Sequence, residues 1–200
     1  VDSIGLVGVL TKVMKSLKEK SGLNIKSVYA NISGQDITSR HSRAVIPLAE
    51  RGNKIITLSD IHKVNEQARI LASNLEEEII HQIPFGYTID SRSNIANPLG
   101  LYSHRLESDL YIVCVKLSLV QSLLRAINQS GFDIKGLFFS GIATSRAVLN
   151  KGLLKGANIF CDIGSDITEL LIFEDGLLKD VDILPVGGDD LTVALAEGLK

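Results

Sequence analysis

The sequence of 200 residues has no tryptophan, one methionine and two cysteines, and it has no excess of charge of one sign. With 21 basic and 23 acidic residues, its formal net charge is −2. This balance gives no reason to propose a nucleic-acid partner, and no basic run indicates binding to a membrane surface. No apolar run approaches the roughly 20 residues that span a bilayer. The first residues also lack the basic start and the small-residue cleavage site of a signal peptide.

The few sulfur and imidazole side chains point to structural roles. Cys114 and Cys161 each lie in an apolar, strand-like run, which predicts two buried free thiols in a reducing compartment. The four histidines show no close pair of ligand types, so a zinc site is not expected. His81 falls on the apolar positions of a strand, and we expect it to be half-buried with a satisfied hydrogen bond.

Apolar residues make up 45% of the chain, and their spacing changes between the periods of a helix and of a strand. Helices are predicted at residues 3–21, 59–75, 118–131, 143–150 and 189–200. Strands are predicted at residues 25–33, 43–48, 79–89, 106–117, 133–139, 157–163, 169–173 and 177–186. A strand–helix–strand–strand unit lies between about residues 35 and 106, so we expect an α/β fold that carries a small inserted subdomain.

Three segments of this unit carry sharper expectations. Ser59 is predicted to cap a helix with one buried stripe, formed by Ile61, Val64, Ala68, Leu71 and Leu75. The strict alternation from Ile79 to Ile89 predicts a strand with one buried face. The strand at 106–117 is apolar on both faces, which is typical of a sheet covered on both sides. The residues between them, 91–100, have the composition of turns.

The stretch CDIGSDITELLIF places a turn of small and polar residues between two apolar strands. Gly164 lets the backbone bend so that N–H groups can converge on an anion, and Ser165 and Thr168 add hydroxyl donors. Asp162, at the end of the first strand, is placed to hold a hydrated Mg²⁺ directly or through water. Asp166 acts against a phosphate, because two unit charges about 4 Å apart repel by roughly 4 kcal/mol at an effective dielectric of 20.

A second glycine turn precedes the last predicted helix. The N-terminal amides after Gly187 and Gly188, together with the helix dipole, favour an anion. Both turns also have a purely structural reading, as a helix start capped by aspartate and as a plain hairpin. A P-loop and a Rossmann fingerprint are excluded because Gly164 is followed by a strand. The order of strand, Asp-x-Gly turn, strand, strand, Gly-Gly turn and helix is more specific than either turn.

This order, in CDIGSDITELLIFEDGLLKDVDILPVGGDDLT, resembles the second phosphate-binding hairpin of the actin-like ATPase superfamily. The segments IKSVYANISG, NPLGLYSHRLESDLYIV and VQSLLRAINQSGFDIKGLFFSGIATSRAVL extend the resemblance over nearly the whole chain, which is most similar to the FtsA family of bacterial cell-division proteins. The resemblance implies an α/β, actin-like ATPase (ribonuclease H-like) fold fragment. In this scheme residues 1–34 are part of subdomain 1A, 35–106 the inserted 1C subdomain, 107–153 the return to 1A and 154–200 the start of 2A.

In that superfamily the hairpin usually reads D-x-G-G-G-T-T-D. Ser165 and Asp166 stand where two glycines are usual, and Ile167 and Glu169 replace a threonine and an aspartate. The resemblance implies Mg²⁺ at Asp162, held through water, and no catalytic residue. It implies a set of nucleotide-binding residues that comprises Asp162, Gly164, Ser165, Asp166, Thr168, Gly187 and Gly188.

The implied function is that of an FtsA-like actin homologue in bacterial cell division. Such a protein binds ATP with Mg²⁺, is at most a weak ATPase, self-associates head to tail, links FtsZ to the membrane and recruits later division proteins. It works in the bacterial cytoplasm at the inner face of the cell membrane, which it reaches through a C-terminal helix absent here. The chain starts abruptly and ends inside a helical pattern, so we expect a fragment of a longer protein.

Three alternatives remain at this point. A phosphotransferase of the sugar-kinase branch needs a general base, and no residue stands out as one. A PilM-like pilus-assembly adaptor would share the fold and the nucleotide site. A degenerate actin-like scaffold that does not bind nucleotide would fit the substituted hairpin.

Overall fold

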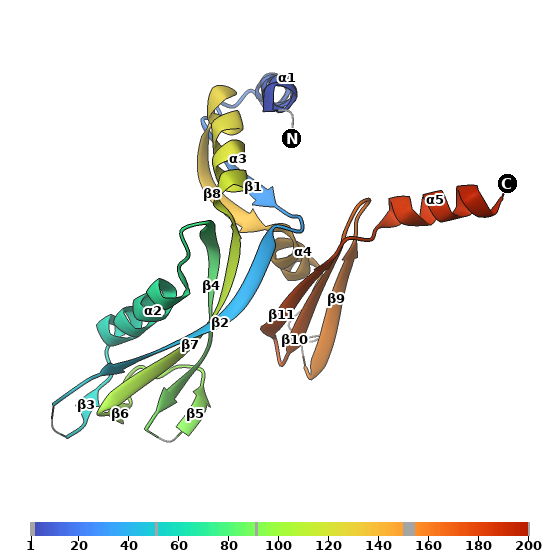
Figure 1. Ribbon diagram of the computed structural model, residues 1–200. Coiled ribbons are helices and arrows are strands. Elements are labelled where there is room, and N and C mark those ends of the chain that lie inside the picture. The colour runs from blue at the N-terminus through green and yellow to red at the C-terminus, as the bar shows by residue number, and fades with distance from the viewer. Residues whose placement is uncertain (1–2, 51, 91, 150–154, 200) are drawn as a thin grey trace.

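The computed structural model describes residues 3–50, 52–90, 92–149 and 155–199. Figure 1 shows a bundle of α1, α3, β1 and β8 at one end and a sheet covered by α2 at the other. A three-stranded sheet lies beside this second sheet, and α5 extends away from it toward the C-terminus. The predicted subdomain boundary between residues 153 and 154 falls outside the described residues.

The first unit follows the predicted order of helices and strands. Its elements are α1 (Ser3–Ser21), β1 (Ser27–Ile32), α3 (Leu117–Gln129), β8 (Asp133–Phe139) and α4 (Ser140–Val148). β1 and β8 pair in parallel, and α1 packs against α3. The predicted helix ends at Gly22 and Gly131 are confirmed, because both glycines have positive φ, +65° and +85°. α4 begins at Ser140, three residues before the predicted start.

The inserted unit is a four-stranded sheet in the order β2-β7-β4-β5 with α2 across it. Its elements are β2 (Ile37–Pro47), α2 (Leu58–Ala72), β4 (Glu77–Ile89), β5 (Arg92–Ile95) and β7 (Arg105–Lys116), with a small ladder of β3 (Lys54–Ile55) and β6 (Tyr102–Ser103). Two expectations were wrong in extent. β2 starts at Ile37 instead of residue 43, and part of the predicted turn at 91–100 forms the edge strand β5.

β7 is buried on both faces, as the sequence predicts, because it separates two hydrophobic cores. The even-numbered apolar side chains of β7 pack with α2 in the first core, and these are Leu106, Leu110, Ile112 and Cys114. The odd-numbered ones join α4 and the three-stranded sheet in the second core, and these are Tyr111, Val113 and Val115. β7 therefore ties the inserted unit to the rest of the chain, together with Ile37 of β2 and Ile80 and Ile83 of β4, which also join the second core.

The cap and the stripe of α2 differ from their predictions. Thr57, and not Ser59, is the N-cap, and it forms a capping box with Asp60, whose carboxylate accepts hydrogen bonds from the Thr57 backbone N–H and hydroxyl at 3.0 and 2.6 Å. The Thr57 hydroxyl holds the pKa of Asp60 below its usual value. Leu71 and Leu75 are 67% and 94% exposed. The buried stripe of α2 consists instead of Val64 and Ala68, which are fully buried, and Ala72.

Polar side chains from β2 fasten α2 to the sheet. The Arg40 guanidinium donates to the last carbonyl of α2, Ala72 O, and to the Glu77 carboxylate, both at 2.7 Å. The Ser42 hydroxyl donates to Ala68 O at 2.7 Å. The bond to Ala72 O satisfies a carbonyl at the helix end that has no partner inside the helix, and the bond from Arg40 lowers the pKa of Glu77.

β4 does not have the single buried face that its alternation predicts. Bulges between Ile79 and His81 and between Pro84 and Gly86 shift its register against β7, so its side chains change face twice along the strand. His81 is half-buried, and its Nε2 accepts a hydrogen bond from the backbone N–H of Phe139 at 2.9 Å. The expectation of a satisfied, half-buried histidine is therefore confirmed.

The third unit is an antiparallel sheet in the order β11-β10-β9, followed by α5. Its elements are β9 (Ala157–Ile163), β10 (Thr168–Glu174), β11 (Leu177–Leu184) and α5 (Gly188–Gly198). β9 was expected to be buried, but it lies at the edge of the sheet, where Ile159 and Ile163 are 70% and 69% exposed. The thiol of Cys161 is exposed on the same face, so the expected burial of both thiols holds only for Cys114.

The position of the α2 cap leads to a first prediction. Replacing Thr57 by alanine removes the capping box and should lower the free energy of unfolding by about 1 kcal/mol. Ser59→Ala, at the cap that the sequence favoured, should change it by less than about 0.5 kcal/mol because this exposed side chain caps nothing. Urea unfolding of the two variants measures the difference. Equal losses would contradict the assignment of Thr57 as the cap.

Candidate functional site

The predicted phosphate turn joins β9 to β10. The backbone N–H of Gly164 donates to Ile167 O at 2.9 Å, which closes the turn. Asp162 lies one residue before the end of β9, on the face of the sheet that turns toward the second core. Ser165 and Asp166 lie at the tip and are exposed to solvent.

The second glycine turn packs directly on the first. The amides of Gly188 and Asp189, the first two of α5, donate to Gly164 O and Ser165 O at 2.9 and 3.0 Å. A Cβ placed on Gly187 would lie only 2.2 Å from Ser165 O, so this approach requires a glycine. A Cβ on Gly188 would meet nothing closer than 3.6 Å. The two turns that the sequence singled out are therefore one structural feature.

Two side chains complete this feature. The Thr168 hydroxyl donates to Val186 O at 2.7 Å and joins the start of β10 to the residues before the second turn. The Asp190 carboxylate accepts a hydrogen bond from the N–H of Gly187 at 2.8 Å, which fixes the start of α5. The N–H groups of Gly188 and Asp189 donate to carbonyls of the hairpin. The donors for an anion at this point would therefore have to be backbone N–H groups of the β9–β10 turn.

Sequence reasoning did not identify the buried role of Glu169. Its side chain is 3% exposed and accepts a hydrogen bond from the Ser33 hydroxyl, at the end of β1. Its other oxygen, Oε2, has no hydrogen-bond partner among the described residues. It lies against the first turn of α4, where a Cβ on Gly141 would be 2.8 Å from it. Asp162 is its cross-strand partner on β9.

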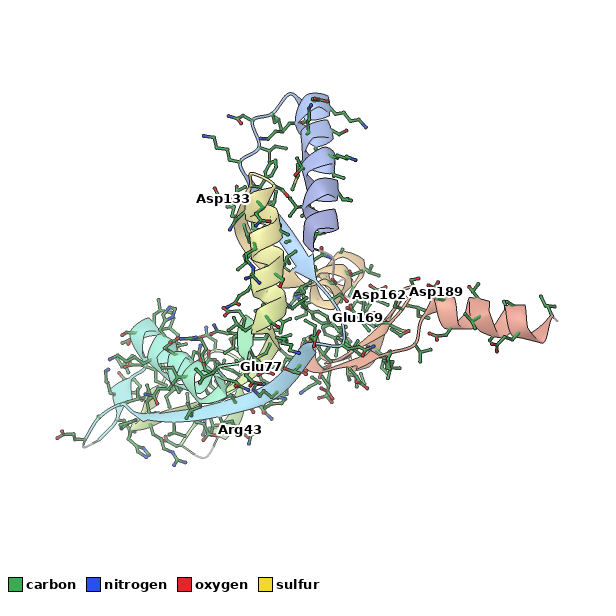
Figure 2. The ribbon with its side chains drawn as sticks, turned by 45° about the horizontal axis from the view of Figure 1, so that its top comes forward. Arg43, Glu77, Asp133, Asp162, Glu169 and Asp189 are labelled. Carbon is green, nitrogen blue, oxygen red and sulfur yellow. The ribbon has the colours of Figure 1, made fainter. Side chains whose placement is uncertain are left out.

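Glu169 thus occupies the point where the third unit meets the first (Figure 2). Burial raises its pKa above the usual value, opposed by the hydrogen bond from Ser33 and reinforced by the charge of Asp162. The sequence does predict a hairpin of these two strands, and their pairing puts residues 162 and 169 side by side. Local pattern alone did not reveal that Ser33, 136 residues away, would meet this carboxyl group.

The arrangement suits a hydrated divalent cation better than a protein-only metal site. Among the described residues there is no group of three or more His, Cys, Asp or Glu side chains that could hold a metal ion. Asp162 offers one carboxylate, which is the way Mg²⁺ is usually held when water and phosphate supply its other ligands. None of the described helices is both long enough and apolar enough to cross a membrane.

The comparisons with known proteins identify the inserted unit. Residues 34–114 match the family described as the SHS2 domain inserted in FTSA. The β2-α2-β4-β7 order of this segment is the strand–helix–strand–strand order predicted from the sequence. We refer to residues 34–114 as the SHS2 domain from here on.

Curated relatives extend the similarity beyond this domain. The cell division protein FtsA of Borreliella burgdorferi is 28% identical over 90% of this chain and 43% of its own length. FtsA of Buchnera aphidicola subsp. Baizongia pistaciae is 28% identical over 96% of the chain and 45% of its own length. FtsA of Escherichia coli is 26% identical over 86% of the chain and 40% of its own length. The chain thus spans less than half the length of these relatives.

A solved structure supports the fold. The PilM-PilN type IV pilus biogenesis complex superimposes with a TM-score of 0.61 at 17% identity, over 95% of this chain and 52% of that one. Together with the SHS2 match, this confirms the predicted α/β, actin-like ATPase fold with its inserted subdomain. The resemblance to FtsA is confirmed by the SHS2 match and by the relatives above. The nucleotide-binding role of the predicted site residues stays a prediction.

The close contact at Gly187 leads to a second prediction. Gly187→Ala forces its methyl group against Ser165 O and should lower the free energy of unfolding by about 1–3 kcal/mol. Gly188→Ala is the matched control, because its methyl group has room and alanine is favoured over glycine in a helix by up to about 1 kcal/mol. Urea unfolding, with amide hydrogen exchange at Asp189, measures both. Equal stability of the two variants would contradict the packing of the two turns.

The buried carboxyl group leads to a third prediction, on pH. Because its folded-state pKa is raised, the contribution of Glu169 to stability is complete below its ordinary pKa of 4.5 and is lost as the pH rises through the raised value. Glu169→Gln cannot titrate, so it should gain stability relative to wild type as the pH is raised from 4.5 toward neutrality. Unfolding free energies across this range test it, with Glu197→Gln on α5 as the control. Parallel curves for wild type and Glu169→Gln would show that this group does not titrate abnormally.

Proposed function

We propose that this chain is part of an FtsA-like actin homologue of bacterial cell division. The protein binds ATP, self-associates head to tail, links FtsZ to the membrane and recruits later division proteins. It acts in the bacterial cytoplasm at the inner face of the cell membrane. The observation that carries this proposal is the SHS2 match at residues 34–114 together with similarity to FtsA over 86–96% of the chain.

The proposed nucleotide site is the pair of packed turns. Gly164 and Ser165 provide the bend and a hydroxyl group, Gly187 allows the close approach of the second turn, and Asp162 holds Mg²⁺ through water. The proposal is supported by the exposure of the tip, which leaves Ser165 and Asp166 open to a ligand. The hydroxyl of Thr168 is already used by Val186 O, so its role is to hold the turn in shape.

The proposed division into subdomains follows the same scheme. Residues 1–34 and 107–153 form part of subdomain 1A, 35–106 form subdomain 1C, and the chain from residue 154 onward opens subdomain 2A. β7 runs through the proposed boundary at 106, so the sheet of 1C continues without a break into 1A. Subdomain 1C is the proposed surface for self-association and for division partners.

A pilus-assembly adaptor of the PilM type is the second candidate. The PilM-PilN complex superimposes on 95% of this chain with a TM-score of 0.61, so the fold is compatible with a role in pilus assembly as well as in cell division. The FtsA relatives match by sequence at 22–28% identity, and this is the reason to place cell division first.

A calorimetric titration with Mg-ATP on the full natural polypeptide tests the nucleotide site. Wild type should bind, and Asp162→Ala should weaken binding by about ten- to hundredfold, the usual effect of removing a residue that orients a metal's ligands. Asp182→Ala is the matched control, because Asp182 is an exposed aspartate of the same sheet. Loss in Asp162→Ala alone supports the proposed site.

Two results would contradict it. Equal affinity of wild type and Asp162→Ala would remove Asp162 from the site. The absence of binding to wild type at millimolar Mg-ATP would favour the degenerate scaffold, whose function resides in its surfaces.

A further inference from the structure

Two residues that lie at β-bulges, Phe85 and Lys179, meet between the SHS2 domain and the three-stranded sheet. In β4, Pro84 and Gly86 pair with successive residues of β7, so Phe85 is the residue left over. In β11, Leu178 and Asp180 pair with successive residues of β10, so Lys179 is left over. Phe85 lies on the side of Ile83 and Lys179 on the side of Val181, and both of these neighbours pack with the second core. These two side chains meet, with Lys179 Nζ 4.1 Å from the centre of the Phe85 ring.

Further contacts hold each partner in this position. Lys179 also pairs with Glu174, on the other side of the β10–β11 turn, at 3.0 Å. The ring of His41, from β2, stands edge-on to Phe85 with centroids 4.7 Å apart. Ammonium over an aromatic face is an attractive pairing, and it is stronger where water is partly excluded. The Lys179 side chain is 29% exposed, so part of its charge is shielded from water here.

A second contact lies beside the first. The hydroxyl oxygen of Tyr111, in β7, is 2.7 Å from Ser39 Oγ and 3.3 Å from Asp180 Oδ1. Burial raises the pKa of Tyr111 to about 12, so the hydroxyl keeps its proton and can donate. Asp180 directly follows Lys179 in β11, so consecutive residues of one strand contact two strands of the SHS2 domain.

The packing around these contacts is incomplete. A cavity of about 290 Å³ lies between the SHS2 domain and the β10–β11 turn. Its walls include Phe85, Gly86 and Asn94 on one side and Glu174 and Lys179 on the other. Interfaces within a chain that are not tightly packed allow the parts to move relative to each other. The second core joins Tyr111 and Val113 to the three-stranded sheet, and the contact of Phe85 with Lys179 adds a specific link beside this cavity.

We propose that Phe85 and Lys179 form a clasp that fixes the orientation of the SHS2 domain relative to the three-stranded sheet. The same two strands, β10 and β11, carry the packed glycine turns at their other end. The clasp thus ties the SHS2 domain to the strand pair that positions these turns. In Figure 1 β11 is the edge strand of its sheet nearest β2, and β11 contacts β2.

Distance measurements between two spin labels test the clasp on the full natural polypeptide. Cys161 is exposed and supplies one label, and Gln67→Cys on the exposed side of α2 supplies the other. Cys114 is fully buried and burial raises its pKa to about 11, so it stays unlabelled. Any reactive cysteine outside residues 1–200 is changed to serine.

Wild type should give one narrow distance distribution. Lys179→Met and Phe85→Leu should each broaden it, because losing a cation–π contact shifts the balance between closed and open arrangements by about two- to fivefold. Lys179→Arg should stay narrow, since a guanidinium also stacks on an aromatic ring. The matched control is Lys135→Met, because Lys135 is also the extra residue of a bulge and lies over a ring, that of Tyr29, but within a single sheet.

Circular dichroism on each labelled variant separates movement from unfolding. A narrow, unchanged distribution in folded Lys179→Met and folded Phe85→Leu would overturn the inference. So would equal broadening in Lys135→Met, because the effect would then be general. If Lys179→Met lowers the folded fraction, Phe85→Leu and Lys179→Arg are compared instead. A broad distribution in Phe85→Leu with a narrow one in Lys179→Arg supports the clasp, and equal distributions overturn it. None of these readouts involves nucleotide, so a failure here is distinct from a failure of the proposed ATP site.

Discussion

Burial of β7 on both faces is the constraint on which the rest of the structure depends. The pleat sends Leu110 and Ile112 toward α2 and Tyr111 and Val113 toward the other core, so one strand contributes to two cores at once. Each fully buried large side chain of this kind contributes roughly 1.5–3 kcal/mol. A polar substitution anywhere from Leu110 to Val115 would weaken one core directly and the other through the shared strand. The SHS2 domain is therefore an insertion in sequence and a continuous part of the packing.

The bulges of β4 determine which of the two cores its side chains join. A regular β4 would keep Phe85 on the same face as Ile83 and Tyr87, and the alternation in the sequence predicts that arrangement. Instead, Phe85 stays on the side of Ile83, which packs with the second core, and it faces β11, whereas the bulge moves Tyr87 into the core under α2. The bulge thus lets the single strand β4 contribute side chains to both cores, although regular pairing builds both sheets.

The sequence predicted what local chemistry determines and missed what depends on distant neighbours. The glycines that end α1 and α3, the doubly apolar β7 and the half-buried His81 all follow from patterns within a few residues. The exposure of Cys161 does not, because the sequence pattern of an apolar strand is the same whether the strand lies at the edge or in the middle of a sheet. The cap of α2 was misplaced by two residues, since Thr57 and Ser59 are both favoured cap types, serine slightly more so, and the contact with Asp60 decides for Thr57. Of the candidate site, the two turns were found, whereas the packing between them and the buried Glu169 depended on tertiary contacts.

The electrostatics of the packed turns restrict what can bind there. Asp162 and Asp166 belong to the first turn, and Asp189 and Asp190 start the helix that packs on it. The helix amides that would offset a negative ligand are partly used, because those of Gly188 and Asp189 donate to the hairpin carbonyls. A bare phosphate would meet carboxylates at energies of roughly 4 kcal/mol for each pair about 4 Å apart at an effective dielectric of 20. A nucleotide at this site would therefore have to bind as its magnesium complex, and Asp162 is the carboxylate that would hold the cation. With a glycine pair in place of Ser165 and Asp166, the backbone of the turn could meet phosphates without an added carboxylate, so the two replacements would increase the dependence of any phosphate binding here on Mg²⁺.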